Sequence, residues 1–163
     1  MIKFRQNIDE LLRKEMDGIK IVGEKNFILN TIRALQLIKS GDIESFLFIK
    51  KYVGVIKQND FSGIDVFSEQ PTFLVGNATS DSNSYWYASC ILHDAEHSFI
   101  YFSLKEQGED GLSGYQGYDA EMYCLEKQIE LLKKINAPSY LIEYATTLKN
   151  SNWYDIPVSR RKW

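Results

Sequence analysis

The residues of this chain best suited to chemistry are its two histidines, which lie four positions apart in the segment His93-Asp94-Ala95-Glu96-His97. Residues four apart on an α-helix lie on the same face, one turn above the other. The two imidazoles can therefore point at one common spot. Two neutral imidazoles on one helical face are the usual beginning of a zinc site, which still needs a third protein ligand.

The third ligand must come from another part of the fold, and Glu121 is the best candidate because it lies near the start of the next long predicted helix. A glycine-rich connection, residues 108–117, would let that helix fold back antiparallel and bring its first turn opposite His93 and His97. Asp119 is the second choice, since it suits the N-cap of that helix better. Three protein ligands would leave one position for a water whose pKa zinc lowers to about 7.

The segment His93-Asp94-x-x-His97 resembles the His-Glu-x-x-His motif of zincin metallopeptidases, with aspartate in place of the catalytic glutamate. In the branch of that family whose third ligand is a glutamate on a following helix, Glu121 matches by position. The resemblance implies zinc held by His93, His97 and Glu121, with Asp94 as general base. It also implies a zincin-like fold and a peptide or protein substrate that pairs with an edge strand of the sheet before the active helix.

Two departures from the zincin pattern affect the choice of base. Aspartate is one methylene shorter than glutamate, and Leu125 stands where that branch often carries a further acidic residue. The same five residues also fit the inverted motif His-x-x-Glu-His, in which Glu96 would be the base. Residues two apart on a helix point to different sides, so one of these carboxylates should face the water. We favour Asp94, because it neighbours the first histidine as in the forward motif and because the inverted family usually has much larger chains.

The same residues also have simpler explanations. A histidine pair at this spacing can be two surface or core imidazoles, and a first-turn glutamate such as Glu121 is favoured by the helix dipole alone. The rival function is therefore a non-catalytic helical interaction domain, with a structural metal or none. Metal-dependent phosphohydrolases also use His-Asp doublets, but they need a further histidine upstream of His93, and the sequence has none.

Cys90 and Cys124 lie one turn before His93 and one turn after Glu121, respectively. Antiparallel helices would bring both cysteines to one level, just past the metal. The simplest interpretation is two small buried apolar residues. A closed Cys2His2 structural zinc site, which would have no water and no catalysis, and a redox-linked pair are the alternatives.

Aromatic residues lie on both sides of the histidine segment, and most are expected in the core. The exceptions are Tyr115 and Tyr118, which belong to the glycine-rich connection. A tyrosine on a mobile loop can donate a hydrogen bond to a developing oxyanion. Both are therefore candidate catalytic residues.

Composition indicates a globular chain of one domain, residues 1–163, because 44% of the residues are hydrophobic and 13% aromatic. The net charge of −3 comes from interspersed charges, which argues against nucleic-acid binding. No apolar run is long enough for a membrane span, and no signal region is evident at the N-terminus. Two cysteines are too few for a disulfide framework. We expect a cytoplasmic protein, or a toxin-like piece of a larger secreted chain.

Hydrophobic periodicity predicts an α+β fold that is predominantly helical, with a small sheet before the histidine helix. The C-terminal residues 153–163 are expected to pack over the fold as a strap. Short β-rich runs at Ile64–Phe67 and Thr72–Val75 predict two strands, with Ile19–Val22 as a possible third. Helices are expected at about residues 8–15, 24–40, 42–56, 83–105, 119–135 and 138–149.

Overall fold

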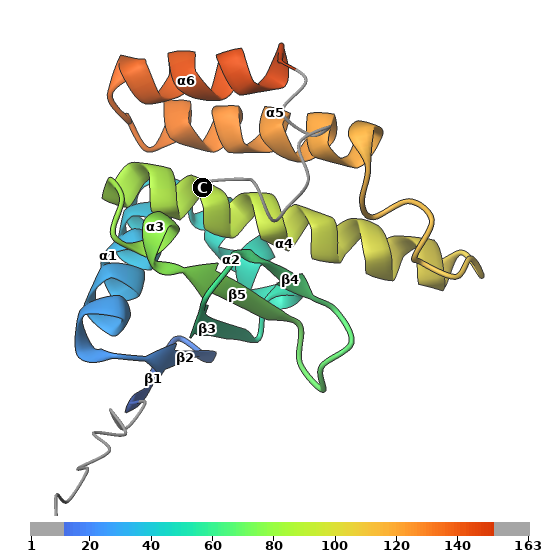
Figure 1. Cartoon of the computed structure of the whole chain (residues 1–163), viewed down its shortest axis with the longest axis horizontal. Coiled ribbons are helices and arrows are strands. Elements are labelled where there is room, and N and C mark those ends of the chain that lie inside the picture. The colour runs from blue at the N-terminus through green and yellow to red at the C-terminus, as the bar shows by residue number, and fades with distance from the viewer. Residues whose placement is uncertain (1–11, 152–163) are drawn as a thin grey trace, which may run out of the picture.

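A computed structural model gives the fold and describes residues 12–151. It is α+β, mostly helical, with one five-stranded mixed sheet (Figure 1). The elements in chain order are β1 (Leu12–Met16), β2 (Ile19–Gly23), α1 (Lys25–Gly41), α2 (Ile43–Tyr52), β3 (Val55–Asn59), β4 (Gly63–Asp65), β5 (Thr72–Gly76), α3 (Asn77–Ser80), α4 (Ser84–Glu106), α5 (Tyr118–Lys134) and α6 (Ser139–Lys149).

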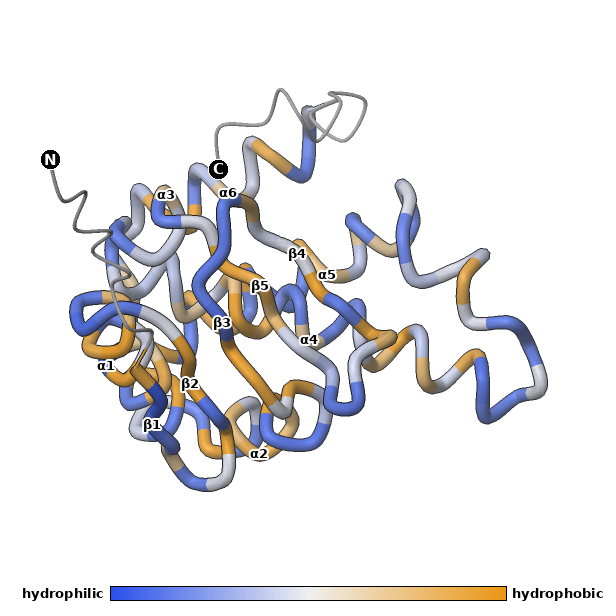
Figure 2. Tube along the Cα trace, turned by 60° about the horizontal axis from the view of Figure 1, so that its bottom comes forward, coloured by the Kyte–Doolittle hydropathy of each residue, from blue (hydrophilic) through white to orange (hydrophobic). Residues whose placement is uncertain are grey.

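The sheet has the strand order β1-β2-β3-β5-β4. The three inner strands β2, β3 and β5 run parallel, and the two edge strands β1 and β4 run antiparallel to their neighbours. The crossover from β2 to β3 contains α1 and α2, as a parallel connection requires. The apolar stretches of β2, β3 and β5 lie side by side in Figure 2.

One face of the sheet packs against the hydrophobic core. Ile21, Ile56 and Phe73 are paired across the three parallel strands, and each is fully buried. Alternate residues such as Lys20 and Lys57 point to the other face and are exposed, which is the period-two pattern of a sheet covered on one side. The helices therefore pack on a single face.

Helix α4 lies on this face at the centre of the molecule. It contacts α1, α2 and the strands β4 and β5, while α5 covers its other side and α6 packs on α5 (Figure 1). Asn83 starts the helix by accepting a hydrogen bond from the backbone N–H of Tyr85 at 2.9 Å. Because α4 is enclosed on two sides, polar side chains on its α5 face are held in a largely buried layer.

Helix α5 runs antiparallel to α4, as the glycine-rich connection predicts. Gln128 contacts Ser89 and His93, and the earlier residue Glu121 contacts His93 and His97. Gly117 begins α5 as its N-cap with φ 96°, a conformation that favours glycine over any residue with a Cβ. The expected N-cap, Asp119, instead lies inside the first turn.

Three expectations about the first half of the chain are wrong. The part of the first expected helix within the described residues is strand β1, because Asp17-Gly18 turns the chain back as a hairpin. The third helix ends at Tyr52, and Ile56 belongs to strand β3 instead. The sheet consequently has five strands, in which Ile19–Gly23 pairs with β1 and β3 and not with the two predicted strands.

The expected C-terminal strap lies outside the described residues. Within residues 12–151, no helix is long and apolar enough to cross a membrane.

Candidate metal centre

The side chains of His93, His97 and Glu121 converge between α4 and α5. Nε2 of His93 lies 3.1 Å from Nε2 of His97 and 3.2 Å from Oε2 of Glu121. Nε2 of His97 lies 3.4 Å from Oε1 of the same carboxylate. All three side chains are mostly buried, with 14%, 6% and 15% of their surface exposed, respectively. The sequence-based prediction that Glu121 meets the histidine pair is confirmed as geometry.

These separations match the spacing of ligands around a tetrahedral metal ion. Ligand atoms about 2.0–2.1 Å from a zinc ion lie about 3.3 Å from one another in a tetrahedron. The three observed separations are 3.1, 3.2 and 3.4 Å. The donor set of two imidazoles and one carboxylate suits zinc as well.

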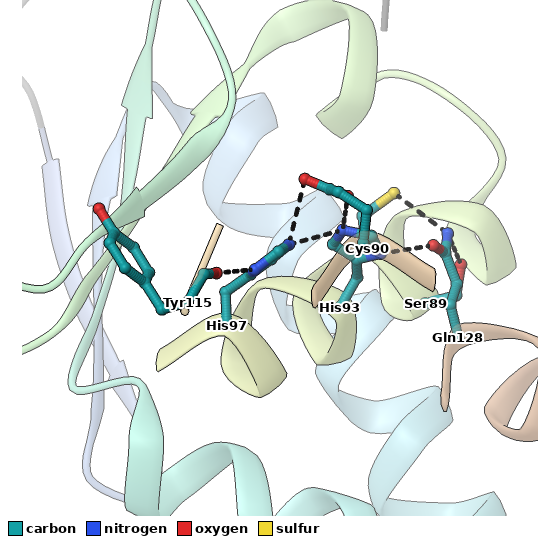
Figure 3. A network of polar contacts seen from close by, with 7 residues as sticks. Ser89, Cys90, His93, His97, Tyr115 and Gln128 are labelled. Atoms are coloured by element: carbon teal, nitrogen blue, oxygen red, sulfur yellow. Dashed lines mark hydrogen bonds and ion pairs between the residues drawn. The ribbon is translucent and has the colours of Figure 1, made fainter. Parts of the chain in front are cut away.

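The other ring nitrogen of each histidine determines its tautomer (Figure 3). Nδ1 of His93 lies 3.1 Å from Oε1 of Gln128, and Nδ1 of His97 lies 2.6 Å from the carbonyl oxygen of Tyr115. Both partner atoms only accept hydrogen bonds, so both Nδ1 atoms carry the proton and donate. In the neutral form of each imidazole, Nε2 is therefore the unprotonated nitrogen and faces the centre, as a metal ligand must.

Gln128 is itself oriented by a short chain of hydrogen bonds. Ser89 Oγ donates to the carbonyl of Trp86 at 2.7 Å, so it accepts from Nε2 of Gln128 at 2.9 Å. This assignment leaves Oε1 of Gln128 as the atom that faces His93. Gln128 is only 2% exposed, and sequence reasoning missed it. The signal available was its position two turns after Glu121, on the same face of α5.

Without a metal, an imidazole Nε2 needs a proton, since three hydrogen-bond acceptors would otherwise face one another. Burial raises the pKa of Glu121, but hydrogen bonds from His93 and His97 outweigh that effect and hold the pKa well below its usual range. Burial also opposes the charged form of His97, yet hydrogen bonds to Cys124 and Glu121 hold its pKa well above the usual value. The centre thus favours positive charge beside the carboxylate, whether a proton or a metal ion.

The two cysteines occupy different places relative to this centre. The ligand atoms of His93, His97 and Cys124 all lie within 4.8 Å of one another. Cys90 is not part of that group, and its Sγ contacts Nε2 of Gln128 at 3.8 Å. Cys90 does not join the histidines and Cys124 in one group of ligand atoms, so the described residues do not assemble a Cys2His2 site.

Asp94 and Glu96 lie on opposite flanks of the histidine pair. The half-buried Asp94 interacts electrostatically with His93, His97 and Glu121, and burial raises its pKa to about 6. Glu96 is 5% exposed and faces Tyr123 and Lys127 on α5.

Burial raises the pKa of Glu96 to about 7, and its Oε2 has no hydrogen-bond partner among residues 12–151. The charges of His93, His97 and Glu121 all act on Asp94, so Asp94 is electrostatically coupled to the whole centre.

The two candidate tyrosines are placed differently from each other. Tyr115 meets the site through its main-chain carbonyl, while its ring points away from the imidazoles (Figure 3). That ring is 7% exposed and packs against Tyr101, with ring centroids 5.4 Å apart. Tyr118 is the first residue of α5 and is exposed. A catalytic role for either hydroxyl stays a prediction.

No protein-family model matches the chain, and comparisons with curated proteins and with solved structures return no match. The geometry of the centre is therefore the basis for a functional proposal.

Proposed function

We propose that this chain is a zinc-dependent hydrolase, a peptidase of zincin-like organisation, with zinc bound by His93, His97 and Glu121. The observation that carries the proposal is the set of 3.1–3.4 Å separations among the two Nε2 atoms and the Glu121 carboxylate. The Nδ1 hydrogen bonds to Gln128 and Tyr115 support it, because they hold both imidazoles in the tautomer that binds metal.

Zinc in such a site polarises a carbonyl and lowers the pKa of a water molecule, which is the chemistry that amide hydrolysis needs. Asp94 would accept the proton of the attacking water. Its electrostatic interaction with His93, His97 and Glu121 supports this role.

The edge strand β4 supports a peptide as substrate. Among the described strands it pairs only with β5, so its outer edge is free to pair with an extended chain. Val66, directly after β4, packs with Tyr101 and Tyr115. Since the carbonyl of Tyr115 binds His97, Tyr115 connects the end of β4 to the centre.

Elemental analysis of the purified chain tests the metal. We expect about one zinc per chain, in line with a single three-residue site, and none in His93→Ala. A matched control is Lys133→Ala, which changes an exposed residue of α5 and should keep the zinc. Wild-type protein that takes up no zinc would refute the proposal.

Peptide cleavage by two variants, each with one candidate carboxylate replaced by an amide, tests which residue is the general base. Asp94→Asn should keep zinc and fold but lose about 10²–10⁴-fold in rate, because a neutral amide cannot accept the proton. Glu96→Gln should cleave nearly as fast as wild type. The reverse result would favour the inverted motif. If both variants cleave like wild type, neither carboxylate is the base. A zinc-loaded wild type that cleaves no peptide would favour the structural-metal alternative.

A further inference from the structure

Cys124 is a buried cysteine at the metal centre to which the three-ligand set assigns no role. It follows Glu121 by one helical turn, so both side chains lie on the face of α5 that packs against α4. Its side chain is 0% exposed, and its Sγ lies within 4.8 Å of a ring nitrogen of each histidine. An inert buried thiol packs equally well among apolar groups, so these polar neighbours point to a further function.

The contact with His97 shows which nitrogen the thiol faces. The Sγ atom of Cys124 lies within 4.8 Å of a ring nitrogen of His97. Nδ1 of His97 is already engaged by the Tyr115 carbonyl at 2.6 Å. Nε2, the nitrogen that points into the centre, is therefore the one left to the thiol. Metal coordination by His97 through Nε2 would put a bound ion next to Sγ.

We propose that the Cys124 thiolate is a fourth zinc ligand and takes the position that water would otherwise occupy. This inference rests on the zinc site proposed above. On binding, the thiol releases its proton to solvent and a zinc–sulfur bond forms. Four protein donors close a tetrahedral site, so hydrolysis requires Cys124 to leave the metal. Cys124 then controls the access of water to the centre.

X-ray absorption at the zinc edge tests the ligand in the unmodified full chain. We expect one sulfur at about 2.3 Å beside nitrogen and oxygen at about 2.0–2.1 Å. A zinc-loaded chain with nitrogen and oxygen neighbours only would overturn the thiolate ligand and leave the three-ligand site intact. A chain that binds no zinc would overturn both proposals.

Cobalt substitution tests which cysteine is involved. Cobalt-loaded wild type should show the visible bands of tetrahedral cobalt and a near-ultraviolet thiolate charge-transfer band. Cys124→Ser should lose the charge-transfer band and keep the visible bands. Cys90→Ser is the matched control, because Cys90 lies outside the ligand group, and it should keep both. A charge-transfer band that survives in Cys124→Ser, or disappears in Cys90→Ser, would contradict the assignment.

Azide binding to the cobalt-loaded protein tests whether Cys124 controls the access of water to the metal. The test does not require cleavage of a substrate. Azide occupies an open cobalt position and shifts the visible bands. It should do so at a lower concentration in Cys124→Ser than in wild type, because the thiolate no longer competes for that position. Equal azide sensitivity of the two proteins would show that the position is open in both, and the gating role would be wrong.

Discussion

Gln128 illustrates how a side chain outside the proposed ligand set can orient a residue of a candidate metal site. Its amide carbonyl accepts the Nδ1–H of His93, and its amide nitrogen donates to Ser89. The first contact is partly buried and the second is buried, so together they hold the imidazole in one orientation. Residues in this position tune metal affinity strongly, because they set the direction and basicity of the ligand.

Gln128→Ala should weaken zinc binding about 10–100-fold, since His93 loses the acceptor for its Nδ1 proton. Competition with a chromophoric chelator measures the dissociation constant. Lys133→Ala, on the exposed side of the same helix, should bind zinc like wild type. An unchanged zinc affinity in Gln128→Ala would show that the hydrogen bond to His93 does not matter for binding.

At the scale of elements, the β1–β2 hairpin depends on a two-residue turn. Asp17 and Gly18 both have positive φ values, 51° and 93°, between the paired residues Met16 and Ile19. This is the geometry of a type I′ turn, for which Asp-Gly is a preferred sequence. A Cβ at Gly18 would meet no atom within 4 Å, so only backbone conformation makes glycine necessary there.

Gly18→Ala should lower the free energy of unfolding by about 1 kcal/mol, the usual cost of a left-handed conformation for a residue with a Cβ. Urea denaturation measures the change. Gly63→Ala is the matched control, because Gly63 also has open space around it but no positive φ, and it should be neutral or slightly stabilising. Equal stability of the two variants would contradict this account of the turn.

A second feature at this scale is Asp42, which joins the α1–α2 junction to the end of α5. Its Oδ2 accepts hydrogen bonds from Ser45 Oγ at 2.6 Å and from Lys134 Nζ at 2.8 Å. Burial raises the pKa of Asp42, but hydrogen bonds from Lys134 and Ser45 outweigh it and lower the pKa below the usual 3.8. A lowered pKa stabilises the fold above about pH 4, and this stabilisation is lost as pH falls through the pKa of the folded state.

Asp42→Asn should therefore lower the free energy of unfolding by about 1 kcal/mol at pH 7, and by less at pH 3. Urea denaturation at both pH values, with a chelator present, measures the difference. Asp60→Asn, at an exposed position between β3 and β4, serves as control. A loss of stability that is the same at pH 3 as at pH 7 would mean that the charge of Asp42 is not its source.

At the scale of the whole molecule, the candidate centre joins two layers. The histidines belong to α4, which packs on the sheet, whereas Glu121 belongs to α5 in the outer layer (Figure 1). A ligand that binds only the folded state stabilises it by mass action. Zinc should thus stabilise the whole fold by holding α5 against α4.

Free zinc at 100 times its dissociation constant should add about 2.7 kcal/mol to the free energy of unfolding. For a chain of this size, each added kcal/mol of stability raises Tm by about 2–4 °C. Calorimetry with zinc and with a chelator measures the shift, and the double variant His93→Ala/His97→Ala should show none. A wild-type Tm that does not respond to zinc would argue against a site shared by the two helices.

Local patterns were enough to predict several parts of this protein. The helical period located α1, α4, α5 and α6, and the i, i+4 spacing of His93 and His97 put both imidazoles on one face. Both signals depend only on neighbours along the chain. The Asp17-Gly18 hairpin could have been found in the same way, but the apolar spacing of the preceding residues was interpreted as a helix.

The tertiary structure alone decided the remainder, because the decisive contacts join residues distant in sequence. Val53 and Ile56 continue the apolar pattern of α2, and only pairing with β2 and β5 makes Val55–Asn59 a strand. The rotation of α5 about its axis determines that Gln128 meets His93 and that Cys124 lies closer to the ligands than Cys90 does. That rotation results from packing against α4 and α6. Sequence periodicity indicates which broad face of α5 is buried, and not which atoms that face contacts.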